Sequence, residues 1–262
     1  MATIHIFRTA ETKYDAEPGF DNARDSGLSE RGLEQCLEFS SHSPFLPFMQ
    51  YVTHVVSSPL RSSIYSCRIA FDRIVSSKQI ILLPELMDIG SLSPSFGSSA
   101  VALNAEFSTQ IDQGALPSGW ESTDPNSAYA YDAGKIKART AAGREWLMDL
   151  AHTAGEGAHI VVMTHGKTAH FVADDFEGVE PPEYKADWDG DLSWRSYRFD
   201  FTAGKMIETL GSRTRRGVPA IHTLTEAENN QLRTVLERRI FHRMSLVQEY
   251  QASHVRAEDV EH

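Results

Sequence analysis

The stretch Ile4–Thr12, IHIFRTAET, decides the fold of this chain. With Ala2 and Thr3 before it, its first part is mostly apolar or β-branched, which is typical of a short strand in a sheet covered on both faces. Arg8 and Thr9 follow this strand directly. Because α/β proteins keep their chemistry at the carboxyl ends of the strands, the sequence predicts that Arg8 and Thr9 lie at a functional edge.

Further strand patterns follow along the chain, and helical patterns alternate with them. Helices are indicated after Ser29, a good N-cap, after Pro59, which suits a first helical turn, and over Lys135–Ala154. Alternation of this kind predicts a doubly wound α/β fold, a mainly parallel sheet with right-handed crossovers and helices on both faces. The further strands are expected at Tyr51–Ser58, Gln79–Glu85 and His159–Gly166.

Two long segments do not fit this alternation and are expected to be covering loops. Gly90–Asn126 is rich in Ser, Gly and Pro, and Phe176–Arg195 is acidic and carries Trp188 and Trp194. Either tryptophan would stack on an aromatic substrate or fix its loop to the core, and both alternatives are open at this point.

The end of the chain is predicted to be a C-terminal helix over about 225–250. Thr225 and Glu228 form a capping-box pattern, and a loose apolar stripe follows them. We therefore divide the chain into an α/β domain, residues 1–211, and a C-terminal extension, residues 212–262. The helix would pack on the domain or on a partner chain, and the second arrangement would give a homodimer.

Composition excludes several classes of function. With 262 residues, 41% of them hydrophobic, the chain can bury a large core, and its net charge of -11 argues against a nucleic-acid partner. Cys36 and Cys67 lack metal-site spacing and are expected to be buried reduced thiols, so we predict no metal, disulfide or cofactor. Without a leader or a long apolar run, we expect a cytoplasmic protein that does not bind membranes.

Four predicted strand ends carry polar or charged groups. Each alone has an ordinary explanation, such as a surface ion pair or a solvated carboxylate. At one edge of a parallel sheet they would instead converge on a crevice, bind an anion and exchange protons. These groups are Arg8 with Thr9, Arg61 after Ser57–Leu60, Glu85, and His165 between Thr164 and Gly166.

The order of these motifs resembles the histidine phosphatase superfamily, the phosphoglycerate mutase-like family, and especially its fungal branch. The resemblance runs from Thr3 to about Gly178 and continues to WRSYRF. It implies an α/β domain whose first strand ends in Arg-His, where the histidine attacks phosphorus and becomes phosphohistidine. The motifs that carry it are IHIFRTAET, LSERGLEQC, VVSSPLRSSIYSC, LLPELMDIG and VVMTHGKTAHFVADDFEG.

Carried over by position, the resemblance assigns roles to four residues. It also shows positions at which this chain differs from the pattern of the family. Arg8 and Arg61 are the phosphate-binding arginines, Glu85 the candidate acid and His165 the second histidine. Thr9 takes the place of the nucleophile, and a threonine hydroxyl cannot form phosphohistidine.

Two further departures lie near the same site. Asp15 stands where the family often has an asparagine that donates to phosphate. Its carboxylate would repel a phosphate by about 1 kcal/mol or more at ~4 Å. Lys167 adds a positive charge after His165. The resemblance thus implies that ordinary phosphatase or mutase catalysis is lost.

These features favour a lyase or isomerase that works on a non-phosphorylated small molecule, anionic or phenolic, by dehydration, isomerisation, cyclisation or C–C cleavage. His165 would exchange protons with Glu85 or Asp15 as its counterpart. Arg8 and Arg61 would hold the charge, and Thr9 would make room for the substrate or hydrogen-bond it. The resemblance to fungal proteins suggests secondary metabolism. The alternatives are a non-catalytic pseudophosphatase that binds a ligand or partner, and a residual phosphatase that uses His165 or water as nucleophile.

Overall fold

A computed structural model describes residues 1–16, 23–90, 92–179, 188, 190–218 and 224–258, with side chains described up to residue 242. Part of the expected acidic covering loop, residues 180–187 and 189, therefore lies outside the described residues. In the described part, no helix has the length and apolar character needed to cross a membrane.

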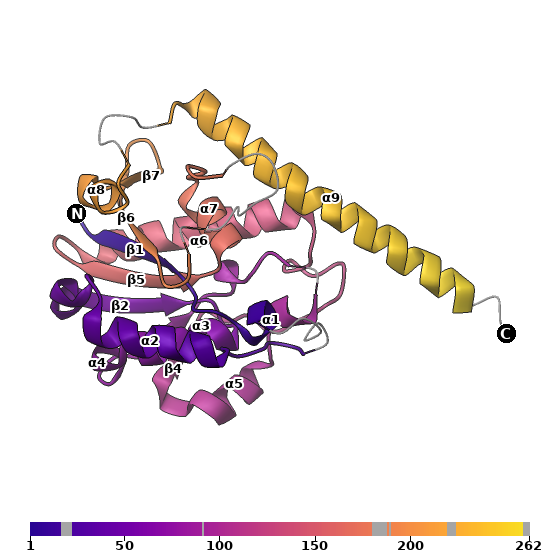
Figure 1. The fold of residues 1–262 in the computed structure, drawn as a ribbon, viewed down its shortest axis with the longest axis horizontal. Coiled ribbons are helices and arrows are strands. Elements are labelled where there is room, and N and C mark those ends of the chain that lie inside the picture. The colour runs from indigo at the N-terminus through magenta and orange to yellow at the C-terminus, as the bar shows by residue number, and fades with distance from the viewer. Residues whose placement is uncertain (17–22, 91, 180–187, 189, 219–223, 259–262) are drawn as a thin grey trace.

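The centre of the fold is a sheet with strand order β4-β3-β2-β5-β1-β6-β7 (Figure 1). Strands β1 to β5 pair in parallel, whereas β6 lies antiparallel to β1, and β7 antiparallel to β6. This confirms the predicted doubly wound, mainly parallel α/β fold. The strands are β1 (Thr3–Arg8), β2 (Val52–Ser57), β3 (Ile80–Leu82), β4 (Ile111–Asp112), β5 (His159–Thr164), β6 (Trp194–Asp200) and β7 (Lys205–Glu208).

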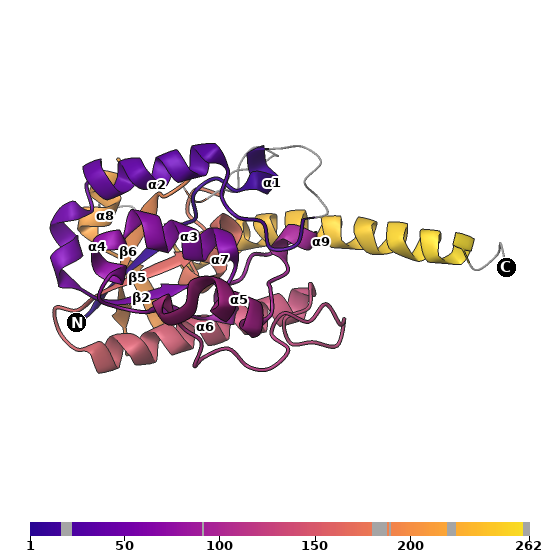
Figure 2. The same cartoon turned by 90° about the horizontal axis from the view of Figure 1, so that it is seen from below.

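Helices cover both faces of the sheet, as Figure 2 shows for α2 and α3 on one side and α6 on the other. Side chains of β1 alternate accordingly: Phe7 joins the core under α2 and α3, and Ile4 and Ile6 join the core under α6 and α7. The helices that complete the domain are α1 (Lys13–Ala16), α2 (Glu30–His42), α3 (Arg61–Ala70), α4 (Asp72–Val75), α5 (Ala100–Phe107), α6 (Ala133–Ala154) and α7 (Gly166–Ala173).

The segment Gly90–Asn126 is not a single covering loop. It contains α5, the short strand β4, and the 3-10 turns η4 (Ser93–Ser95) and η5 (Ser108–Gln110). Leu103 and Phe107 of α5 are buried in the core. The expectation of one long loop was wrong because short apolar elements were hidden among the Ser, Gly and Pro residues. Two further 3-10 turns precede β2 and follow β3, namely η2 (Leu46–Tyr51) and η3 (Pro84–Leu86).

Cys36 and Cys67 are buried free thiols, as expected. Burial raises the pKa of each thiol to about 12, so neither is a reactive thiolate.

The C-terminal part consists of α8 (Leu210–Arg215) and α9 (Glu226–Glu258), and α9 extends beyond the body of the protein in Figure 1. The predicted capping box is present, since the Thr225 amide and hydroxyl both donate to Glu228 Oε2 at 2.8 Å. Asn229 ties α9 to the domain: its amide nitrogen donates to the Asp174 carbonyl, and its oxygen accepts from the Phe176 amide, both at 2.9 Å. The expected boundary at 211/212 falls inside α8.

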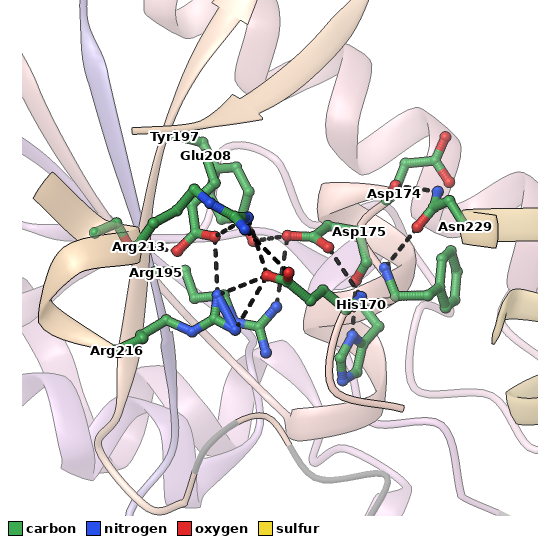
Figure 3. A network of polar contacts seen from close by, with 12 residues as sticks. His170, Asp174, Asp175, Arg195, Tyr197, Glu208, Arg213, Arg216 and Asn229 are labelled. Carbon is green, nitrogen blue, oxygen red and sulfur yellow. Dashed lines mark hydrogen bonds and ion pairs between the residues drawn. The ribbon is translucent and has the colours of Figure 1, made fainter. Parts of the chain in front are cut away.

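A network of charged side chains joins β6, β7 and α8 to the loop after α7 (Figure 3). Arg213 donates to both oxygens of Glu177, at 3.0 and 3.1 Å, and Arg216 donates to Glu208 at 2.8 Å. Arg195 pairs with Asp175 at 3.5 Å. This network fixes the loop that holds Asn229, and therefore the start of α9.

His5 is a buried histidine in β1. Its Nδ1 lies 2.9 Å from the Ser196 hydroxyl, and its Nε2 lies 2.8 Å from Nδ1 of His159. Burial, followed by the charges of His159 and Arg215, lowers the pKa of His5 from 6.5 to about 3. The native protein therefore holds His5 neutral at pH values where the unfolded chain would protonate it.

We expect this group to make the protein less stable in acid. Above pH 6.5 His5 is neutral in both states and has no effect, and as the pH falls below 6.5 the unfolded chain alone gains the proton. The free energy of unfolding then falls by about 1.4 kcal/mol per pH unit until the pH approaches the native pKa. The free energy of unfolding would be measured with urea at about pH 7.5 and at pH 5. Between these two pH values it should fall by about 2 kcal/mol less in His5→Gln than in the native protein. Equal losses would contradict this.

Candidate active site

A cavity of about 140 Å³ lies at the carboxyl ends of β1 and β5. Backbone pairing places its central residues, because Arg8 lies opposite Thr164 in the parallel ladder and the Thr9 amide donates to the Thr164 carbonyl at 2.9 Å. Thr9 and His165 are thereby held beside each other. Five predicted site residues line this cavity, namely Arg8, Thr9, Asp15, His165 and Lys167.

His165 is the N-cap residue of α7 and is mostly buried. Its Nε2 lies 3.0 Å from the Ser58 hydroxyl and 3.3 Å from the Ser63 hydroxyl. Nδ1 has no hydrogen-bond partner among the described residues, which leaves this nitrogen to a ligand. Burial lowers the pKa of His165, and although Asp88 opposes this shift, the net direction is downward. His165 is therefore neutral at pH 7 and can accept a proton.

Asp88 is a cavity residue that the sequence did not reveal as functional. Its Oδ2 accepts a hydrogen bond from the Ser95 hydroxyl at 2.8 Å. Burial alone would raise its pKa, but His165, Lys167 and the Ser95 hydrogen bond outweigh this and lower it. Asp88 is thus an ionised carboxylate in the same cavity as a neutral imidazole. It lies in the quoted motif LLPELMDIG, where its place after the third strand was the available signal.

Glu85, the predicted acid, does not line the cavity. The 3-10 turn η3 directs it toward α6, where its Cβ lies against Gly143 and its Oε1 accepts from the Tyr129 hydroxyl at 3.2 Å. The chain continues from this turn into the cavity, so Asp88 occupies the position expected for Glu85.

Arg61, the predicted second anion-binding arginine, is also absent from the cavity lining. Its guanidinium contacts Asp25 at 3.2 Å and Glu106 at 2.7 Å, and it also donates to the Ser98 hydroxyl. Burial lowers the pKa of Arg61, but Glu106 and Asp25 outweigh burial and raise it. These partners come from segments distant in the sequence, so the strand-end pattern alone could not reveal them.

Trp188, predicted to bind substrate, is fully buried and lies outside the cavity lining. The guanidinium of Arg195 lies 4.1 Å from the centre of its ring. The aromatic rings of His170 and Tyr197 also lie near Trp188, with ring centres 5.2 and 6.3 Å from the centre of the Trp188 ring. This corresponds to the alternative in which the tryptophan fixes its loop to the core.

Charges in the cavity are balanced. Arg8 pairs with Asp191 at 3.1 Å, and Lys167 supplies the second cation. Asp15 accepts from the amide and hydroxyl of Thr12, at 3.2 and 2.7 Å, and shares the cavity with Asp88. Across the described residues, no group of three or more His, Cys, Asp or Glu side chains is placed to hold a metal ion.

Solved structures of other proteins share the fold of this chain. The ecdysone phosphate phosphatase from Bombix mori, solved with tungstate, is 11% identical, with a TM-score of 0.55 over 86% of this chain and 95% of that chain. A mycobacterial glucosyl-3-phosphoglycerate phosphatase in complex with VO3 is 16% identical, with a TM-score of 0.48 over 79% and 96%. The comparison with curated protein sequences gives no match.

The family models give the most direct result. The model of the histidine phosphatase superfamily (branch 1) matches residues 4–206, which includes β1 from its second residue, β2 to β6 and all the cavity residues named above. This chain therefore belongs to the histidine phosphatase superfamily.

Proposed function

We propose that this chain is a divergent histidine phosphatase-fold enzyme that lacks the phosphohistidine nucleophile and transfers protons on a non-phosphorylated small molecule. One observation carries the proposal: two carboxylates, Asp15 and Asp88, share the cavity with a neutral His165, while the Arg61 guanidinium is bound by acidic partners outside it. We take Thr9 to occupy the nucleophile's place.

Charge favours a substrate that carries less negative charge than a phosphate ester. A phosphate dianion in the cavity would meet two cations, Arg8 and Lys167, and two carboxylates, with Arg8 already paired to Asp191. A carboxylate, enolate or phenolate carries one negative charge and is repelled less. Such a group also fits the donors of Arg8 and Lys167.

The cavity residues suit proton abstraction next to a carbonyl. His165 Nδ1 would remove the proton as the electron pair moves into the carbonyl, and Arg8 with Lys167 would stabilise the resulting enolate. Asp88 would stabilise the imidazolium that forms, because its charge raises the pKa of His165. Return of the proton from His165 to another carbon completes an isomerisation. In a dehydration, His165 instead gives the proton to a hydroxyl group on the neighbouring carbon, which leaves as water while the enolate electron pair forms the C=C bond. The resemblance to fungal proteins favours a substrate from secondary metabolism.

The second candidate is a non-catalytic binding protein. It is favoured by the position of Arg61, because an arginine held by Asp25, Glu106 and Ser98 contributes to the fold of the α3 and α5 region and not to the cavity. Such a protein would bind an anion at Arg8 and Lys167 without turnover.

Hydrogen–deuterium exchange at carbon separates the two candidates. Small keto and hydroxy carboxylic acids would be incubated with the protein in D2O, and loss of the C–H signal beside the carbonyl would be followed by NMR. We expect the native protein to exchange at least one of them about 10²-fold faster than His165→Ala, the usual contribution of a positioned base. Binding without exchange would support the non-catalytic alternative.

A phosphatase assay provides a second test, whose result could contradict the proposed function. We expect native protein and His165→Ala to hydrolyse 4-nitrophenyl phosphate equally slowly, because the cavity holds no phosphohistidine nucleophile. Hydrolysis by the native protein that depends on His165 would overturn the proposal in favour of the residual phosphatase.

A further inference from the structure

A second cavity of about 130 Å³ adjoins the first. The two share five lining residues, so they lie next to each other, with Asp88 and Ser95 in the wall that they share. The shared residues are Tyr14, Asp88, Pro94, Ser95 and Lys167. We call the second cavity the annex.

The walls of the annex differ from those of the first cavity. Ile89, Leu92, Leu236 and Ile240 supply apolar side chains, and its polar residues beyond the shared ones are Tyr131 and Arg239. The Tyr131 hydroxyl donates to the carbonyl of Ile240 at 3.4 Å. The first cavity is therefore lined mainly by charged and polar groups, whereas the annex adds four apolar side chains beside Arg239.

Helix α9 builds one wall of the annex. Leu236 and Ile240 lie one turn apart and are buried together with Phe171 and Phe176. Asn229 and Arg233 hold this part of α9 against Asp174. The family model ends at residue 206, so this wall lies outside the matched region.

We propose that the annex is a subsite for an apolar tail, and that the substrate is a monoanion with a hydrocarbon or aryl chain attached to its charged head. The head binds Arg8 and Lys167, and the tail lies against Leu92, Leu236 and Ile240. This inference rests on the proposed function, because it assumes that the anion occupies the first cavity. Burial of the tail supplies affinity that a small cavity with balanced charge cannot supply alone.

A series of straight-chain carboxylates tests the subsite. The dissociation constants of acetate, butanoate, hexanoate and octanoate would be measured by NMR titration of the His165 ring signals. We expect each buried methylene to tighten binding about three- to fourfold until the annex is filled. Arg8→Met should weaken all four acids, because every head group uses Arg8.

Two variants and a control locate the effect. Leu92→Trp, at a partly exposed position, fills the annex and should remove the dependence on chain length, while acetate still binds. Octanoate should bind more tightly than acetate, and Ile240→Ala should reduce this ratio of dissociation constants by at least about threefold. Val101→Trp, on the exposed side of α5 and outside both cavities, should behave as the native protein.

The outcomes separate this inference from the proposed function. If acetate and octanoate bind equally, or Leu92→Trp leaves the chain-length dependence intact, the annex is not the tail subsite, and the proposed function is unaffected. If no carboxylate perturbs His165, or Arg8→Met has no effect, the anion site itself is wrong, and both proposals are overturned.

Discussion

The double variant Thr9→His with Asp15→Asn is expected to hydrolyse 4-nitrophenyl phosphate at least ~10²-fold faster than the native protein. Position 9 lines the cavity at the end of β1, so a histidine there can attack phosphorus. The nitrogen–phosphorus bond would form as the bond to the aryl oxygen breaks, and water would then release phosphate. Initial rates of nitrophenolate release measure the gain.

Three controls show which change matters. Thr9→His alone should be about fivefold slower than the double variant, since the Asp15 carboxylate still repels the phosphate by about 1 kcal/mol. Asp15→Asn alone should stay at the native rate, because it adds no nucleophile. His165→Ala in the double variant should remove most of the gain. If the double variant binds phosphate but does not turn over, the missing nucleophile is not what separates this cavity from a phosphatase.

The second large effect is on stability. Arg213→Met should lower the free energy of unfolding by about 3 to 5 kcal/mol, the usual cost of removing one partner of a buried ion pair. Arg213 is 7% exposed and pairs with Glu177 and with Glu208, which is 4% exposed. Arg216 also pairs with both carboxylates in the network of Figure 3, but the loss of Arg213 removes one of these two cations. Urea unfolding at neutral pH measures the loss.

A matched exposed pair provides the control. Arg31 and Glu34 lie 3.2 Å apart on α2 and are more than half exposed, so Arg31→Met should change stability by no more than about 0.5 kcal/mol. Because the network fixes the loop that holds Asn229, Arg213→Met should also weaken octanoate binding more than acetate binding. A loss of stability below about 1 kcal/mol would show that the network is not a buried structural unit.

Much of the α/β domain could be predicted from periodicity. The strands at residues 3–8, 52–57, 80–82 and 159–164 are mostly apolar or β-branched runs that need no partner to be recognised, because a strand covered on both faces buries most of its side chains. The antiparallel strands β6 and β7 were not predicted as strands. β6 mixes Arg195 and Arg198 with its aromatic residues, and its pairing with β1 and β7 makes this segment a strand.

The positions of some residues of the candidate site could likewise be predicted from the sequence, and those of others could not. Arg8, Thr9 and His165 follow buried strands directly, and their positions in the cavity follow from strand order and parallel register. Glu85 and Arg61 follow strands as well, but a 3-10 turn and the acidic partners Asp25 and Glu106 direct their side chains elsewhere. Side-chain direction after a strand depends on contacts from distant segments, which local sequence does not contain.

The sequence alone determined the four strands β1, β2, β3 and β5 and the residues that follow them, because these depend on local apolar pattern and residue identity. The tertiary structure alone decided that Asp88 enters the cavity and that Leu236 and Ile240 of α9 line the adjoining annex. Both outcomes depend on segments far apart in the chain, brought together when the apolar faces of α6, α7 and α9 are buried.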